Sequence, residues 1–196
     1  MIAYEAPPGA PRLRDLDADV TAMLLDLYRH LGGRREDPDL RPGSWDLSAN
    51  GVLIELDEEL HFNRYRETTL RQTWAQSLPW NRPYLEFCQS RESECLRAAT
   101  WGKRWTSESS ANMFGDAAPP GDLLSAAGSP RWKQRALYDA IKDAVAAHGA
   151  GTKVARLSVY DEVSGQSLGN VLTGSARCQI EDLLALVDAR TAQAPP

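Results

Sequence analysis

The 196-residue chain is 42% hydrophobic and 25% charged, which is typical of a globular protein, and it is long enough for one well-buried domain spanning residues 1–196. Its net charge of −5 excludes a uniformly basic nucleic-acid-binding protein, and its three cysteines, an odd number without a CxxC pair, argue against a disulfide framework or a cysteine-rich zinc site and are expected to be reduced thiols. The first residues lack a basic start followed by an apolar run, and no apolar stretch of about eighteen residues occurs, so we expect a cytoplasmic protein without membrane spans.

The first element predicted along the chain is a helix over Leu16–Leu31. The Pro-rich residues 1–12 before it are expected to be disordered. Apolar residues recur at helical spacing, aspartates occupy the first turn, and Gly32-Gly33 ends the pattern. His30 lies near the helix end, where a polar or positive side chain favours the helix dipole, so we interpret it as a capping residue rather than a metal ligand.

The next segment, Ser44–Phe62, is predicted to form a β-hairpin whose second strand runs to about Glu58. Asn50-Gly51 is the strongest short hairpin signal, because both central positions of a type I′ turn need positive φ, which Asn tolerates and Gly allows freely. A two-residue loop there fixes the register, with the pairs Ala49–Val52, Leu47–Ile54, Asp46–Glu55, Trp45–Leu56 and Ser44–Asp57. One face then carries the apolar residues Trp45, Leu47, Ala49, Val52, Ile54 and Leu56. The other face carries the acids Asp46, Glu55 and Asp57.

Two helices and a loop are predicted in the middle of the chain. The pattern from Arg66 to about Ser77 is helical, and another helix lies around Leu85–Ala99. A short strand-like piece follows over residues 97–105. Residues 106–129 are rich in Gly, Pro, Ser and Ala, and we expect them to form a surface loop.

The last third of the chain is predicted to contain two helices and a buried strand. A helix over Pro130–His148 begins with proline in its first turn and ends at Gly149. A strand over Lys153–Tyr160 and a helix beginning near Ser175 follow, and residues 191–196 are expected to be disordered. On the first of these helices, residues one turn apart indicate a solvated face: Tyr138, Asp139 and Lys142. The order of elements predicts an α/β or α+β fold, a small mixed sheet with a central β-hairpin flanked by helices.

The acidic face of the hairpin has two interpretations. Charged residues are expected on the wet side of a half-buried antiparallel sheet. Directly opposed carboxylates nevertheless lose part of the ~0.2–1 kcal/mol of a good cross-strand pair, and no Lys or Arg lies within residues 44–60 to relieve them. Either arginines from elsewhere, such as Arg64 or Arg66, or a divalent cation could neutralise the acids, because Mg²⁺ and Mn²⁺ prefer carboxylate and water oxygens.

Residues 62–105 differ in charge from the first third of the chain. They carry eight Arg and Lys residues against four Glu, with several aromatic residues among them, whereas residues 1–61 hold thirteen acids and six Arg. Such a mixture can bind phosphates and stack on bases. The alternative is that the aromatic side chains pack in the core.

The spacing of the acids resembles that of the PD-(D/E)XK nuclease superfamily, in which an Asp near the end of one strand precedes a hairpin and an acid-x-acid/Lys pair on the next strand. Asp46 matches the first acid and Glu55 the second. The stretch VLIELDEELHFNRYRETTLRQ is also similar to the branch of very-short-patch repair endonucleases, where an acid-x-Asp strand leads to a His-containing step and a basic helix. On that resemblance Asp57 and His61 join the site, and the fold has a restriction-endonuclease-like core.

The resemblance implies a metal-dependent nuclease that hydrolyses phosphodiester bonds, with nucleic acid, and DNA in particular, as the expected partner. Asp46, Glu55 and Asp57 would hold Mg²⁺ or Mn²⁺. His61 would orient or deprotonate water, and the contacts to phosphate would come from Arg64, Arg66 and Arg71.

The chain departs from the superfamily pattern at Asp57, where most members have Lys. Lys103 or Lys133 could supply that group from elsewhere in the sequence. Two alternatives stay open: a catalytically inactive member of the fold that binds nucleic acid or protein in defence or repair, and an acidic immunity or inhibitor-type binding protein. A homodimer or a protein partner is compatible with each of them, and no membrane association is expected.

Overall fold

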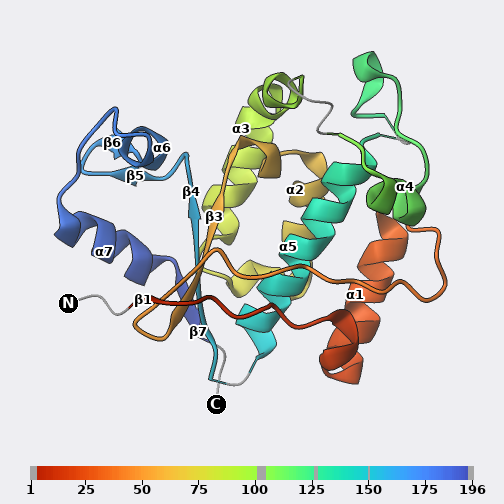
Figure 1. Ribbon diagram of the computed structural model, residues 1–196, viewed down its shortest axis with the longest axis horizontal. Helices are drawn as coiled ribbons and strands as arrows, with labels where there is room; N and C mark the ends of the chain where they lie inside the picture. Colours follow the sequence, from red (N-terminus) through yellow and green to blue (C-terminus); the bar gives the residue numbers. More distant parts are fainter. Residues whose placement is uncertain (1–3, 101–104, 126–127, 150, 194–196) are drawn as a thin grey trace.

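The computed structural model in Figure 1 describes residues 4–100, 105–125, 128–149 and 151–193. Its strands are β1 (Tyr4–Glu5), β2 (Leu47–Ala49), β3 (Val52–Asp57), β4 (Lys153–Ser158), β5 (Glu162–Val163), β6 (Gln166–Ser167) and β7 (Thr191–Gln193). Five of them form a mixed sheet in the order β1-β2-β3-β4-β7, and β5 pairs with β6 in a separate ribbon. β3 and β4 are parallel and the other neighbours are antiparallel. The mixed α/β class is therefore confirmed.

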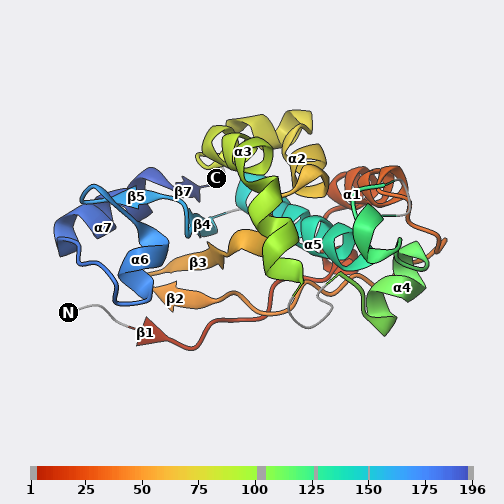
Figure 2. The same ribbon diagram turned by 90° about the horizontal axis from the view of Figure 1, so that it is seen from above.

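Helices cover both faces of this sheet. They are α1 (Ala18–His30), α2 (Arg64–Leu70), α3 (Asn81–Ala99), α4 (Glu108–Phe114), α5 (Pro130–His148), α6 (Leu168–Leu172) and α7 (Ile180–Ala189). Figure 2 shows α6 and α7 on one side of the sheet and α5 with α3 on the other, while α1 and α4 pack beyond α5. None of the helices in the described residues is long and apolar enough to cross a membrane.

The Asn-Gly turn forms as predicted. The φ angles of Asn50 and Gly51 are both positive, 52° and 75°. β2 pairs with β3 in the predicted register, with the pairs Leu47–Ile54, Ser48–Leu53 and Ala49–Val52. The ladder begins at Leu47, so the pairs predicted for residues 44–46 do not belong to it.

The two faces of β3 are both covered, which differs from the half-exposed hairpin considered above. One face carries the apolar residues Val52, Ile54 and Leu56, which continue the apolar face of the neighbouring strand β4 and pack against α7. The other face lies against α5, and it buries Glu55 and Asp57, which are 4% and 0% exposed. The interpretation of this acidic face as the wet side of the sheet is therefore wrong. Of the predicted apolar face, Leu47 is 43% exposed and Trp45 packs on the α5 side.

The middle of the chain differs from its predicted boundaries. The helix predicted for Arg66–Ser77 is divided into α2 and a 3₁₀ turn over Thr73–Ser77. The next helix, α3, begins four residues earlier than predicted. It also includes residues 97–99 of the predicted strand-like piece, whose residues 101–104 lie outside the described part of the chain.

Three segments predicted to lack regular structure contain some. The predicted surface loop 106–129 includes α4, whose Met113 and Phe114 are buried against α5. Residues 1–12 contribute β1, and residues 191–196 contribute β7, each as an edge strand of the sheet. Residues 1–3 and 194–196 lie outside the described residues.

The remaining helices follow the predicted apolar periodicity. α5 has the predicted bounds, and α1 lies within its predicted range. The last helix begins at Ile180 rather than near Ser175, and β4 ends two residues before Tyr160. The three cysteines are free, as predicted.

Candidate functional site

The side of α5 that faces the sheet carries charged residues into the interior. Asp139, Lys142 and Asp143 are at most 6% exposed, because β3 and β4 cover this side of the helix. The interpretation of Asp139 and Lys142 as part of a solvated face is therefore wrong. A buried charge without a partner costs several kcal/mol, so the fold depends on how these groups are paired.

Arg156 of β4 neutralises the acids at the centre of this layer. Its guanidinium donates two parallel hydrogen bonds to Asp57, Nε to Oδ2 at 2.8 Å and Nη2 to Oδ1 at 2.6 Å. It also donates to Asp139 Oδ1 at 2.9 Å and to Asp143 Oδ1 at 3.0 Å. Burial raises the pKa of Asp57, but the neighbouring cations, Arg156 first, outweigh burial and hold that pKa well below its ordinary range. Asp57 is therefore a permanent anion in the interior.

Arg66 of α2 completes the buried network. Its Nη1 donates to Asp143 Oδ2 at 2.7 Å, and its side chain is fully buried. The prediction that Arg66 contacts nucleic acid is therefore wrong. Arg64 and Arg71 lie at the surface of α2, each in an ion pair with a glutamate.

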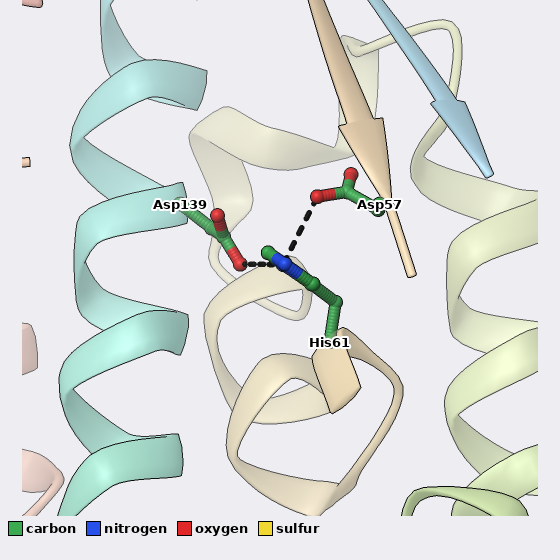
Figure 3. Close-up of side chains that lie close together, drawn as sticks. All are labelled: Asp57, His61 and Asp139. Atoms are coloured by element: carbon green, nitrogen blue, oxygen red, sulfur yellow. Dashed lines mark hydrogen bonds and ion pairs between the residues drawn. The ribbon is translucent and has the colours of Figure 1, made fainter. Parts of the chain in front are cut away.

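His61 lies between β3 and α5. It ends a 3₁₀ turn, Glu59–His61, that directly follows β3. Its Nδ1 is 2.8 Å from Asp139 Oδ2 and 3.0 Å from Asp57 Oδ1, as Figure 3 shows. Burial lowers the pKa of His61, but Asp139 and Asp57 outweigh it and raise that pKa to about 9. In the metal-free protein the imidazole is therefore protonated at neutral pH.

Glu55 and Lys142 form a second ion pair at the edge of the network. Lys142 Nζ is 2.7 Å from Glu55 Oε1 and donates to the Ser44 carbonyl at 2.8 Å. Asp46 is next to this pair, since its Oδ2 accepts a hydrogen bond from the Leu56 N–H at 2.9 Å. Burial raises the pKa of Glu55 to about 7, against the opposing effect of Arg156 and Lys142.

Charged residues of the hairpin segment and of α5 surround one cavity, which we call the β3–α5 pocket. Its volume is about 350 Å³. The hairpin side contributes Asp46, Glu55, Glu58 and His61, and the α5 side contributes Arg131, Arg135, Tyr138, Asp139 and Lys142. Carboxylates and cations thus face each other across a space large enough for a small anionic group and its water.

The pocket brings together only part of the predicted site. Asp46, Glu55 and His61 line it, whereas Asp57 lies behind it on Arg156. The trio Asp46, Glu55 and Asp57 is therefore not gathered around one point. Within the described residues, the one group of three acids or histidines whose ligand atoms all lie within 4.8 Å of one another is Asp57, His61 and Asp139.

Of the two lysines predicted to supply the missing group, the structure describes one, Lys133. Lys133 lies beside the Tyr65 ring on another side of α5 and does not line the pocket, and Lys103 lies outside the described residues. Lys142 supplies it instead. Sequence reasoning missed the roles of Arg156 and Lys142. Arg156 carries a signal, because it interrupts an otherwise apolar strand, whereas Lys142 carries none, because α5 has charged residues along much of its length.

The stability of the metal-free protein is expected to fall at alkaline pH through His61. Its pKa is about 9 in the folded protein and 6.5 without neighbours, so its stabilisation is fully present below pH 6.5 and is lost as the pH rises through 9. At ~1.4 kcal/mol per pKa unit, the free energy of unfolding should decrease by about 3–4 kcal/mol over this range. Urea unfolding in EDTA at both pH values measures the decrease.

The matched control for this prediction is a substitution of His30, the exposed histidine at the end of α1. His61→Gln should flatten the alkaline decrease, whereas His30→Gln should keep it, because His30 is exposed. An equally steep decrease in His61→Gln and in the wild type would contradict the assignment.

Comparisons with known proteins identify a family whose function is unknown. The model of a family of unknown function, DUF7255, matches residues 26–174. That range includes the hairpin, α5 and β4, and thus every residue named for the β3–α5 pocket and the buried network. No curated protein and no solved structure matches the chain.

Proposed function

We propose that this chain, which belongs to the DUF7255 family, is a metal-dependent nuclease that hydrolyses phosphodiester bonds at the β3–α5 pocket. The observation that carries the proposal is the Glu55–Lys142 pair, 2.7 Å apart, beside the Asp46 carboxylate. The hairpin lacks the lysine of the PD-(D/E)XK pattern, and α5 offers one to the second acid of that pattern. The order of elements, a leading helix, the acidic hairpin, a later helix and a parallel strand, also agrees with the resemblance.

The donor set of the pocket suits a hard divalent cation. Asp46 and Glu55 offer carboxylate oxygens, and neither belongs to the buried Arg156 network. Mg²⁺ and Mn²⁺ prefer such oxygens together with water. When bound, the ion would lower the pKa of a water ligand and neutralise charge on the phosphate.

The cationic side chains of α5 are suited to binding phosphate. Arg131 and Arg135 line the pocket opposite the acids. Within the described residues, Arg135 Nη1 is buried and has no hydrogen-bond partner, so a phosphate oxygen could accept from it. These two arginines replace Arg64 and Arg71, which lie outside the pocket, as the proposed contacts to nucleic acid.

His61 acts in this proposal as a donor and not as a base. Its Nδ1 is occupied by the Asp57 and Asp139 carboxylates, which leaves Nε2 for the pocket. With a pKa of about 9 the ring carries both protons at neutral pH. The protonated imidazole can therefore orient a water or stabilise charge on a phosphate oxygen. DNA as the substrate, a homodimer and a cytoplasmic location remain predictions.

Incubation of the metal-free protein with supercoiled plasmid and single-stranded DNA, with and without Mg²⁺ or Mn²⁺, tests the proposal. Cleavage should require the ion and should fall about 100-fold or more in Glu55→Gln, because the ligand charge and the partner of Lys142 are lost. Glu86→Gln, which changes an exposed glutamate of α3, should cleave like the wild type.

Two outcomes would count against a nuclease. Absence of cleavage with every divalent ion, by a protein that still binds DNA, would favour the inactive binding member of the fold. Cleavage that survives Glu55→Gln would place the chemistry outside the β3–α5 pocket or in a contaminant.

A further inference from the structure

We propose that Asp57, His61 and Asp139 form a second cation site, selective for a divalent transition-metal ion and separate from the Asp46–Glu55 oxygens. The three residues come from three elements, the end of β3, the 3₁₀ turn after it and the middle of α5. Their side chains nevertheless point toward one another, as Figure 3 shows. This site can be tested apart from the nuclease proposal, because it uses neither Asp46 nor Glu55. The two proposals share His61, whose Nε2–H can still donate into the pocket when Nδ1 binds an ion.

The distances within the group fit ligands around one ion. Asp57 Oδ1 and Asp139 Oδ2 lie 3.0 and 2.8 Å from the same nitrogen, His61 Nδ1. Neighbouring ligands at right angles around an ion, with bonds of about 2.1 Å, lie about 3.0 Å apart. The Nδ1–H group donates to Asp139, and attraction between the imidazolium and the second carboxylate holds Asp57 beside the same nitrogen. The two carboxylate oxygens and Nδ1 therefore already converge on one point, as ligands around an ion do.

The carboxylates and guanidinium groups of the buried network carry one net negative charge next to His61. The carboxylates of Asp57, Asp139 and Asp143 face two guanidinium groups, Arg66 and Arg156. One negative charge thus remains on the side that faces His61. A proton on His61 balances this charge in the metal-free protein. A divalent ion that displaces the proton to solvent leaves one net positive charge, which an anionic ligand from the pocket can neutralise.

The neighbours of the three ligands hold them in position. Arg156 donates to Asp139 Oδ1, which leaves Oδ2 of that carboxylate toward His61. The same guanidinium fixes both oxygens of Asp57. Such outer partners orient metal ligands in many proteins. His61 and Asp139 also line the β3–α5 pocket, which gives an ion and its water ligands a route of entry.

The ligand set determines which ion fits. One imidazole nitrogen and two carboxylates suit Mn²⁺, Co²⁺ or Zn²⁺ better than Mg²⁺, which prefers oxygen ligands alone. The oxygen-only pair Asp46 and Glu55 has the opposite preference. A directly bound nitrogen is therefore the signature that separates the two sites.

Pulsed EPR of the metal-free, full-length protein with one equivalent of Mn²⁺ tests the site through that nitrogen. The wild type should show modulation from a directly bound imidazole ¹⁴N. His61→Gln should lose it and His30→Gln should keep it, because His30 lies on α1 away from the network. Asp139→Asn should weaken Mn²⁺ binding, measured by titration calorimetry, about 10- to 100-fold.

Results on the wild type alone can overturn the proposal, so it does not depend on the folding of the variants. Mn²⁺ that binds without a nitrogen ligand, or no binding of Mn²⁺ at all, would exclude the site. Glu55→Gln separates it from the nuclease proposal: this variant should keep the nitrogen signal even though it loses cleavage. A nitrogen signal in a wild type that cuts no DNA would refute the nuclease and leave the cation site standing.

Discussion

Replacing Arg156 with methionine is expected to lower the free energy of unfolding by about 4 kcal/mol. The guanidinium binds the carboxylates of Asp57, Asp139 and Asp143, and all four groups are buried. Methionine fills a similar volume but leaves these carboxylates without their main counter-charge. Removing one partner of a buried ion pair costs about 3–5 kcal/mol, a large part of the 5–15 kcal/mol that stabilises a typical domain. Urea unfolding at neutral pH measures the loss.

Two further variants show whether this loss comes from burial and geometry. Arg82→Met removes an arginine that pairs with Glu86 at the surface of α3, and it should change the free energy of unfolding by less than about 0.5 kcal/mol. Arg156→Lys keeps the charge but loses the two-pronged contact with Asp57, so its effect should lie between the two. A loss below about 1 kcal/mol in Arg156→Met would mean that the network is solvated and not a buried core.

The local features of the hairpin could be predicted because they depend on neighbouring residues. Asn50 and Gly51 require positive φ to make a tight turn, and that geometry fixes which residues of β2 and β3 face each other. The same holds for α5, whose proline start and glycine end lie within the pattern itself. Such signals predict the elements, but they do not show what each face packs against.

The error about the acidic face has that physical origin. An alternation of apolar and acidic residues is compatible with a sheet exposed on one side, and it is equally compatible with a sheet whose acidic side meets cations of another layer. The second case depends on Arg156 and Lys142, which lie about ninety to a hundred residues further along the chain than Asp57 and Glu55. Local periodicity carries no information about those pairings. For the aromatic residues of 62–105, composition predicted burial as one of two interpretations, and Tyr84 and Trp80 are indeed buried.

The candidate site was predicted in part for a related reason. Asp46, Glu55 and His61 come from one continuous segment, so their spacing alone placed them near each other, and all three line the pocket. The helix contributes the other half of the site. Which of several lysines reaches Glu55 is decided by how α5 is rotated against the sheet, and only the packing fixes that rotation.

Lys142→Met is expected to reduce metal-dependent cleavage by about 100- to 1000-fold while costing less stability than Arg156→Met. The lysine is the group that the proposed chemistry needs beside the second acid, and removal of one positioned charge or donor in an active site has effects of this size. The stability cost should be only about 1–2 kcal/mol. The reason is that Glu55, whose pKa is already about 7, can take up a proton near neutral pH when its partner is removed.

The pH profile distinguishes a role in the reaction from a role in folding. Lys142 lowers the pKa of Glu55, so Lys142→Met should raise that pKa and shift the acid limb of residual cleavage to higher pH. Lys133→Met removes a buried lysine from the same helix outside the β3–α5 pocket, and its rate per folded molecule and its acid limb should match the wild type. Of these two lysines, Lys142 is the one that contacts Glu55. Equal cleavage rates in Lys142→Met and Lys133→Met would therefore show that α5 does not supply the lysine missing from the hairpin.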